Sequence, residues 1–154
     1  MEAMILAIDP GDTMSGYVEI LNGVVIYAGK LDNQEVMRLL IKNAYDRVYI
    51  ERIVLRGKSG KTLRDTCEWV GRFDSWACAH GNGPVRLITR NQVRARLDCK
   101  DDAAVRKHLL GQGWPRLKGD AMQALAVAVV GMELDEEERA SETHVFVQRL
   151  PVAG

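Results

Sequence analysis

The stretch Met4–Gly16, MILAIDPGDTMSG, constrains the fold more than any other part of the sequence. Its apolar run, Met4–Ile8, is continuous, which is typical of a central strand covered on both faces. The run ends at Asp9, and Pro10 and Gly11 then turn the chain. We therefore expect Asp9 at the end of a buried strand, with its carboxylate reachable from solvent.

A hairpin is expected to follow this turn. Gly16–Leu21 alternates well enough to predict a second strand, and Asn22-Gly23 is a two-residue hairpin signal leading into Val24–Ala28. A strand that ends in Asp-Pro-Gly before a hairpin allows three interpretations. The carboxylate caps the turn, or it is a metal ligand of a ribonuclease H-type nuclease, or the segment is the phosphate loop of an actin-like ATPase. The acidic residues further along the chain must decide between them.

The charge of this 154-residue chain is balanced overall but unevenly distributed. Its 21 basic and 21 acidic residues give a net charge of zero, so a global basic signal for nucleic acid is absent. Between Arg52 and Lys118, however, 15 basic residues stand against 6 acidic ones, which leaves +9 in the middle and −9 at the two ends. This split favours a polyanionic partner for the middle of a single domain.

Cysteine usage and hydropathy point to a reduced, intracellular environment. The three cysteines, Cys67, Cys78 and Cys99, form no Cys-x-x-Cys pair, which argues against a disulfide framework. Together with His80 they match no standard zinc spacing. No signal peptide is recognisable, and no segment reaches the roughly 20 apolar residues of a membrane helix. We therefore expect a soluble cytoplasmic protein without a membrane partner.

A second acidic strand is expected after a helix over Asn33–Tyr45 that Asp32 caps. Arg47–Ile53, RVYIERI, is rich in β-branched and aromatic residues and carries Glu51 near its end. Burying a glutamate there is costly unless it has a partner, and a metal ion is an efficient partner. The alternative, that Glu51 points out of an edge strand, is weakened by Asp9 in the neighbouring strand.

The middle of the chain is basic. Arg56–Lys61, RGKSGK, lacks the GxxxxGK[ST] spacing of a P-loop but suits a loop that holds a phosphodiester backbone beside a metal site. Helices are expected over Leu63–Ala79, Thr89–Leu97 and Asp101–Gly111, with a short strand over Val85–Ile88. The last of these helices opens with two aspartates, which we interpret as caps and not as catalysts.

The last strong element is expected over Lys118–Met132, where an almost wholly apolar run predicts a helix buried on most of its surface. Asp120 stands in its first turn, where the helix dipole stabilises negative charge. The same residue completes a cluster of three carboxylates if the helix start faces the two acidic strand ends. We expect a nuclease domain over residues 1–134 and an acidic C-terminal extension over 135–154, in which His144–Leu150 could add a small strand.

Taken in order, these motifs resemble the phage and prophage branch of the RuvC-like Holliday junction resolvases. The resemblance covers Ile5 to about Met132 and depends on IDPG-x4-G, VYIER, TCEWVGRF, ITRNQVRARL, DDAAVRKHLL and LKGDAMQALAVAV. It implies an α/β, ribonuclease H-like fold with a mixed five-stranded sheet flanked by helices. It also implies a metal-dependent, structure-selective endodeoxyribonuclease that acts as a homodimer on four-way junctions, with forks or flaps as further candidate substrates.

The resemblance assigns catalytic and metal-binding roles to Asp9, Glu51 and Asp120. The family's usual fourth acid lies three residues after the last of these, and here that position is Gln123. A glutamine can coordinate a metal through its carbonyl oxygen but brings no negative charge, which puts the affinity for a second metal in doubt. The implied cofactor is a pair of Mg²⁺ ions about 4 Å apart, which Mn²⁺ could replace.

The same interpretation assigns phosphate contacts to basic residues in the middle of the chain. These residues are Arg56, Lys58, Lys61, Arg90, Arg94, Arg96, Lys100 and Lys118. Two hypotheses compete with an active nuclease. A branched-DNA-binding protein with weak or no cleavage is motivated by Gln123. An actin-like ATPase normally needs a second phosphate loop and a much longer chain, which this sequence does not offer.

Overall fold

The computed structural model describes residues 3–55, 57 and 60–149, with side chains described as far as residue 143. Two of the predicted DNA contacts, Arg56 and Lys58, therefore lie outside the described residues. The strands are β1 (Met4–Asp9), β2 (Met14–Leu21), β3 (Val24–Asp32), β4 (Arg47–Arg52) and β5 (Val85–Thr89). The helices are α1 (Asn33–Lys42), α2 (Lys61–Ala79), α3 (Arg90–Arg96), α4 (Asp102–Gly111) and α5 (Gly119–Arg149).

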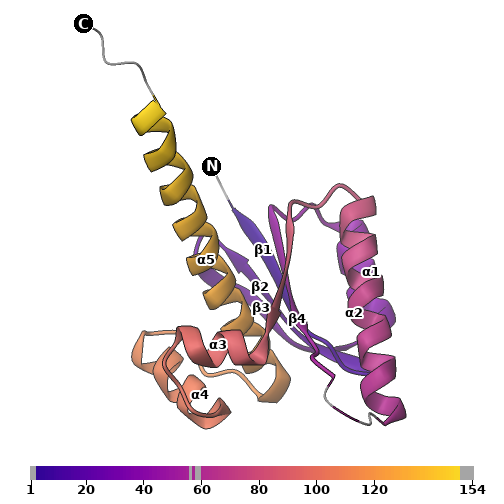
Figure 1. The fold of residues 1–154 in the computed structure, drawn as a ribbon. Coiled ribbons are helices and arrows are strands. Elements are labelled where there is room, and N and C mark those ends of the chain that lie inside the picture. The colour runs from indigo at the N-terminus through magenta and orange to yellow at the C-terminus, as the bar shows by residue number, and fades with distance from the viewer. Residues whose placement is uncertain (1–2, 56, 58–59, 150–154) are drawn as a thin grey trace, which may run out of the picture.

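The strands form one sheet in the order β3-β2-β1-β4-β5. β1, β2 and β3 pair antiparallel, whereas β4 pairs parallel with both β1 and β5. Helices α1 and α2 cover one face of this sheet and α5 lies across the other, with α3 and α4 near the start of α5 (Figure 1). The predicted mixed five-stranded sheet flanked by helices is confirmed.

Strand β1 is buried on both faces, as its continuous apolar run predicts. Leu6 and Ile8 pack in the core beneath α1 and α2, whereas Ile5 and Ala7 pack in the core beneath α5. Successive residues of a strand alternate between its two faces, so Asp9 follows Ala7 on the α5 side. The fold thus directs the first candidate carboxylate toward the start of α5.

Helix α5 is much longer than the sequence predicts, and the predicted strand over residues 144–150 is wrong as far as Arg149; Leu150 lies outside the described residues. The acidic segment 133–142 contains five glutamates, together with one Leu, one Arg and one Ala, all of which are good helix formers. Extending an existing helix costs less than nucleating a new element. The end of α5 projects beyond the sheet (Figure 1), and the expected boundary after residue 134 falls inside this helix.

A buried acid holds α5 against the sheet near that expected boundary. Asp135 is 5% exposed and accepts a hydrogen bond from the Tyr49 hydroxyl on β4. The Arg86 guanidinium on β5 pairs with the same carboxylate at 2.8 Å. A buried carboxylate needs such partners, because an unpaired buried charge is strongly destabilising. The packed part of the fold therefore reaches at least residue 135.

Close packing of α5 on β4 yields a stability prediction. A Cβ atom at Gly131 would lie 2.4 Å from the Tyr49 ring, which is too close for any carbon contact. We expect Gly131→Ala to destabilise the protein by about 1–3 kcal/mol in urea unfolding, because overpacking outweighs the gain in helix propensity. In α2, Gly71 has open space around it, so Gly71→Ala should stabilise the protein by up to about 1 kcal/mol. Equal effects of the two substitutions would contradict this packing.

Candidate active site

The sheet register places a row of five residues side by side on the α5 face. Lys30 of β3 pairs with Gly16 of β2, which in turn pairs with Asp9 of β1. Asp9 and Glu51 each follow the last paired residue of the parallel strands β1 and β4. Glu51 then pairs with Ile88 of β5. The row therefore consists of a lysine, a glycine, two neighbouring carboxylates and an isoleucine, in that order.

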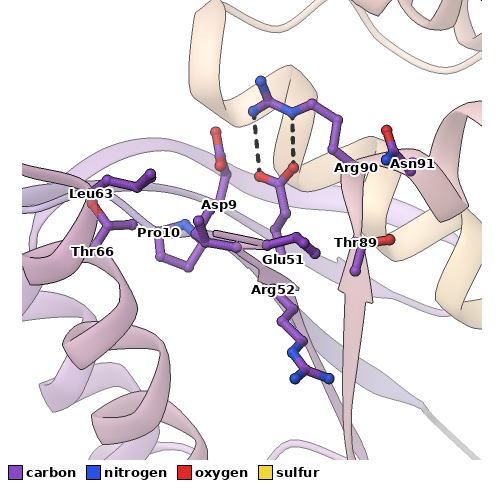
Figure 2. Close-up of a pocket in the computed structure, with 11 residues that line it drawn as sticks. Asp9, Pro10, Glu51, Arg52, Leu63, Thr66, Thr89, Arg90 and Asn91 are labelled. Carbon is purple, nitrogen blue, oxygen red and sulfur yellow. Dashed lines mark hydrogen bonds and ion pairs between the residues drawn. The ribbon is translucent and has the colours of Figure 1, made fainter. Parts of the chain in front are cut away.

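The two carboxylates lie close together at the ends of their strands. Asp9 is 7% exposed and Glu51 is 1% exposed, and Glu51 is close enough to raise the pKa of the Asp9 carboxyl group. Figure 2 shows both side chains pointing the same way, while Arg52 points to the opposite side of β4. Strand β4 lies between β1 and β5, so the alternative of an exposed Glu51 on an edge strand is wrong.

The third carboxylate reaches this row because Gly16 has no side chain. A Cβ atom at Gly16 would lie 2.4 Å from the backbone carbonyl of Asp120, so only glycine lets α5 begin this close to β2. Asp120, Asp9 and Gln123 line one hollow of about 240 Å³. The Asp120 carboxylate is held there by the Lys30 ammonium group at 2.9 Å. Asp120 therefore shares this hollow with Asp9, whereas Glu51 does not line it, and the Asp120 carboxylate is paired to a lysine.

A second cation binds Glu51 from the other side. Thr89 forms a capping box with Gln92 that starts α3 directly after β5, and this places Arg90 beside Glu51. The Arg90 guanidinium donates from Nε to Glu51 Oε1 at 2.9 Å and from Nη2 to Oε2 at 3.4 Å (Figure 2). It also reaches Asp102 Oδ2 at 3.5 Å. Arg90 thus lies between Glu51 and the start of α4.

Gln123, predicted as a metal ligand, lies within the site. Its amide nitrogen donates to Glu51 Oε1 at 3.2 Å. Gln123 is one turn along α5 from Asp120, and both line the hollow that contains Asp9. The glutamine therefore supports the buried Glu51 carboxylate with a hydrogen bond, and it adds no negative charge to the site.

The carboxylate oxygens suit a hard divalent cation, but two of the three acids are already paired with protein cations. Carboxylate oxygens are the ligands that Mg²⁺ prefers. Within residues 3–55, 57 and 60–149, no three acidic, histidine or cysteine side chains come close enough together to share one metal ion. Lys30 and Arg90 explain this, since they hold Asp120 and Glu51 in ion pairs. Asp9 and Glu51 therefore remain two acids at neighbouring strand ends, with Asp120 held apart from them by Lys30.

The basic residues predicted to bind DNA fall into two groups. Arg94 pairs with Asp102 at 3.0 Å, Arg96 pairs with two glutamates of α5, and Lys61 pairs with Asp65. Lys100 and Lys118 are exposed and form no ion pair with any residue that the structure describes. Asp101, interpreted as a cap, does cap α4.

Three residues that line or adjoin the site were not predicted to lie there: Lys30 and Arg106 were not considered, and Asp102 was interpreted only as a cap, although Asp101 is the N-cap and Asp102 pairs with Arg90. Lys30 was missed because its position depends on the register of β3, which shifts between Glu19 and Ile20. Asp102 and Arg106 line the hollow with Asp9, yet they come from α4, whose placement against α5 carries no local sequence signal. Such residues are found only when the tertiary arrangement is known.

Burial dominates the protonation of Asp9. It raises the pKa of this carboxyl group to about 9, and the hydrogen bond and charge of Glu51, followed by the charge of Asp120, add to the increase. Arg90 acts in the opposite direction. Without a metal, Asp9 is therefore neutral at pH 7 and can donate a hydrogen bond to Glu51. A bound cation would favour the ionised form instead.

This pKa predicts how stability changes with pH in the absence of metal. Between pH 4 and pH 9, native Asp9 keeps a proton that the unfolded chain releases, so stability must fall as the pH rises through this range. Asp9→Asn keeps the hydrogen-bond donor but does not titrate. We expect the variant to be more stable than wild type at pH 7 in EDTA by at least about 1 kcal/mol, with no such advantage below pH 4. Urea unfolding of both proteins across pH measures this, and parallel curves would contradict it.

Comparison with known proteins supports the fold. No protein-family model matches the sequence, and no curated protein matches it. RuvC of Thermus thermophilus in complex with a Holliday junction substrate has a TM-score of 0.66 at 17% identity, covering 83% of this chain and 91% of that chain. Another structure of T. thermophilus RuvC has a TM-score of 0.65 at 19% identity, covering 84% of this chain and 92% of that chain. The chain therefore has the RuvC type of ribonuclease H-like fold.

Proposed function

We propose that this protein is a Mg²⁺-dependent crossover junction endodeoxyribonuclease of the phage and prophage branch, which resolves Holliday junctions and other branched DNA. The observation that carries this proposal is the buried Asp9–Glu51 pair at neighbouring strand ends, with Asp120 lining the same hollow as Asp9. The fold supports it, because a matching RuvC structure contains a Holliday junction. Paired, buried carboxylates in an open hollow are a costly feature for a protein that does not use them.

The roles of individual residues follow from their positions. Asp9 and Glu51 would hold the metal through carboxylate oxygens, and Asp120 would complete its coordination from the start of α5. The bound ion would supply an activated water and stabilise the leaving oxygen of the phosphodiester. Arg90 lines the hollow shared by Asp9 and Asp120, and it also lines a second hollow of about 490 Å³ that contains Asp9 and Glu51. Its guanidinium can therefore contact a phosphate placed against the acids. Mn²⁺ could replace Mg²⁺, because it accepts the same oxygen ligands.

The proposed partner is branched DNA, and the proposed assembly is a homodimer, because a twofold dimer presents one site to each of two equivalent strands of a junction. We place the activity in the cytoplasm of a bacterial host cell, where its DNA substrate would be. Among the residues that the structure describes, no helix has both the length and the apolar character of a membrane span.

Junction cleavage tests the proposal. A labelled synthetic four-way junction and a matched linear duplex are incubated with wild type, Asp9→Asn or Asp12→Asn in Mg²⁺, Mn²⁺ or EDTA. We expect metal-dependent cuts in the junction only, and a loss of at least about 10³-fold in Asp9→Asn, because the metal-binding carboxylate is removed. Asp12 is exposed and outside both hollows, so Asp12→Asn should cleave like wild type. Wild-type protein that binds junctions but never cuts them would overturn the nuclease assignment.

A second candidate function, a branched-DNA-binding protein with weak cleavage, is favoured by one observation: Gln123 stands where a fourth acid is expected, and it donates a hydrogen bond to Glu51. Gln123→Asp separates the two functions. If cleavage by wild type is weak, this variant should cut junctions at least about 10²-fold faster at limiting Mg²⁺, because added negative charge strengthens cation binding. If wild type already cuts efficiently, the rate should stay within a few-fold, and the weak-cleavage hypothesis fails.

The ion-pair pattern predicts which basic residues contribute most directly to DNA affinity. Lys118 is exposed and precedes α5, whereas Arg96 is held by Glu133 and Glu137. We expect Lys118→Ala to weaken junction binding and to reduce the slope of log affinity against log salt by about one. Arg96→Ala should change this slope less and lower thermal stability more. Fluorescence anisotropy over a salt series measures both slopes, and equal slope changes would contradict this distinction.

A further inference from the structure

The row of residues at the site has a protein cation at each side of its acids. Lys30 pairs with Asp120 at 2.9 Å, and Arg90 pairs with Glu51 at 2.9 Å. Each of these side chains therefore occupies a position beside a carboxylate where a metal ion could otherwise bind. We propose that this site binds one divalent cation, between Asp9 and Glu51, and that Arg90 and Lys30 supply the positive charge that a second ion would bring. This inference rests on the proposed nuclease function.

The hydrogen bonds of Glu51 leave room for one cation. A carboxylate offers about four lone-pair positions. Arg90 takes two of them and the Gln123 amide takes a third, which leaves one position on the carboxylate that neighbours Asp9. A divalent ion can replace the Asp9–Glu51 contact without removing either the arginine or the glutamine. A second ion on Glu51 would have to displace one of them.

Arg90 is fixed in place by more than Glu51. Its Nη1 lies 3.5 Å from Asp102, which Arg94 holds from the next turn of α3 at 3.0 Å. Breaking the Arg90–Glu51 pair would leave Glu51, which is 1% exposed, without its main counter-charge. A guanidinium held this firmly beside a reacting phosphate is preorganised to stabilise negative charge that develops there. Arg90 therefore stays in the site while the metal binds.

The charge balance of the site also favours a single divalent ion. Asp9, Glu51 and Asp120 carry three negative charges when ionised, and Arg90 and Lys30 cancel two of them. A phosphate in the site adds one negative charge, so one divalent ion brings the total to neutrality and a second would leave it at +2. Arg106 lines the same hollow and would make the total more positive still. Like charges at such short separations repel strongly.

The Lys30–Asp120 ion pair opposes the binding of a second ion less strongly than the Arg90–Glu51 pair does. Its side chain is 55% exposed and its partner Asp120 is 47% exposed, so solvent screens this pair. Gln123 lies one turn further along α5 in the same hollow. Removing the Lys30 charge and adding a carboxylate at position 123 should therefore open a second cation position between Asp120 and residue 123.

Metal stoichiometry tests the proposal independently of cleavage. Mn²⁺ is titrated into the full-length protein, and free Mn²⁺ is followed by electron paramagnetic resonance. We expect wild type to bind one Mn²⁺ per chain and Lys30→Met/Gln123→Glu to bind two. The matched control is Lys42→Met/Gln112→Glu, which makes the same change in charge at two exposed positions outside both hollows. It should bind one Mn²⁺, as wild type does.

Each outcome has a defined meaning. Two Mn²⁺ ions per wild-type chain, together with junction cleavage, would overturn the single-ion inference and leave the proposed function intact. One ion in both wild type and Lys30→Met/Gln123→Glu would overturn the role given to Lys30. Two ions in the control variant would show that surface charge alone explains the second ion, which also overturns that role. A wild-type protein that neither binds Mn²⁺ nor cuts junctions would refute the proposed function itself.

Discussion

The burial of two neighbouring carboxylates, Asp9 and Glu51, is the constraint on which the rest of the structure depends. Each ends a central strand on the α5 face of the sheet, where low solvent access makes negative charge expensive. The protein meets this cost by raising the pKa of Asp9 and by pairing Glu51 with the Arg90 guanidinium and the Gln123 amide. The same pair of carboxylates is the proposed cation site, which connects the stability of the fold to its proposed chemistry.

The surrounding elements keep this arrangement in place. Gly16 lets α5 begin directly over the row, so Asp120 and Gln123 reach the acids from above the sheet. Helices α3 and α4 hold Arg90 through the ion pairs of Asp102, and Arg96 ties α3 to α5. Several arginines in the basic middle of the chain therefore build the site, and a smaller exposed set remains for DNA.

Much of the fold and of the candidate site could be predicted from the sequence, and the features that could not be predicted have physical reasons. Asp9 and Glu51 were found because an acid at the end of an apolar strand breaks a strong local pattern. The length of α5 was not predicted, because the alternation of Val145 and Val147 resembles that of a strand. Their conformation is instead determined by the helix already formed upstream. Lys30 was not predicted to lie at the site, because strand register is a tertiary property.

The most direct test is a crystal structure of the protein grown with Mn²⁺, with anomalous differences measured at the manganese edge. We expect an anomalous peak that bridges the carboxylates of Asp9 and Glu51, with the Arg90 guanidinium still bound to Glu51. Crystals grown at saturating Mn²⁺ that show no peak between these two carboxylates, or a peak only elsewhere on the chain, would contradict the claim that this buried pair is a metal site.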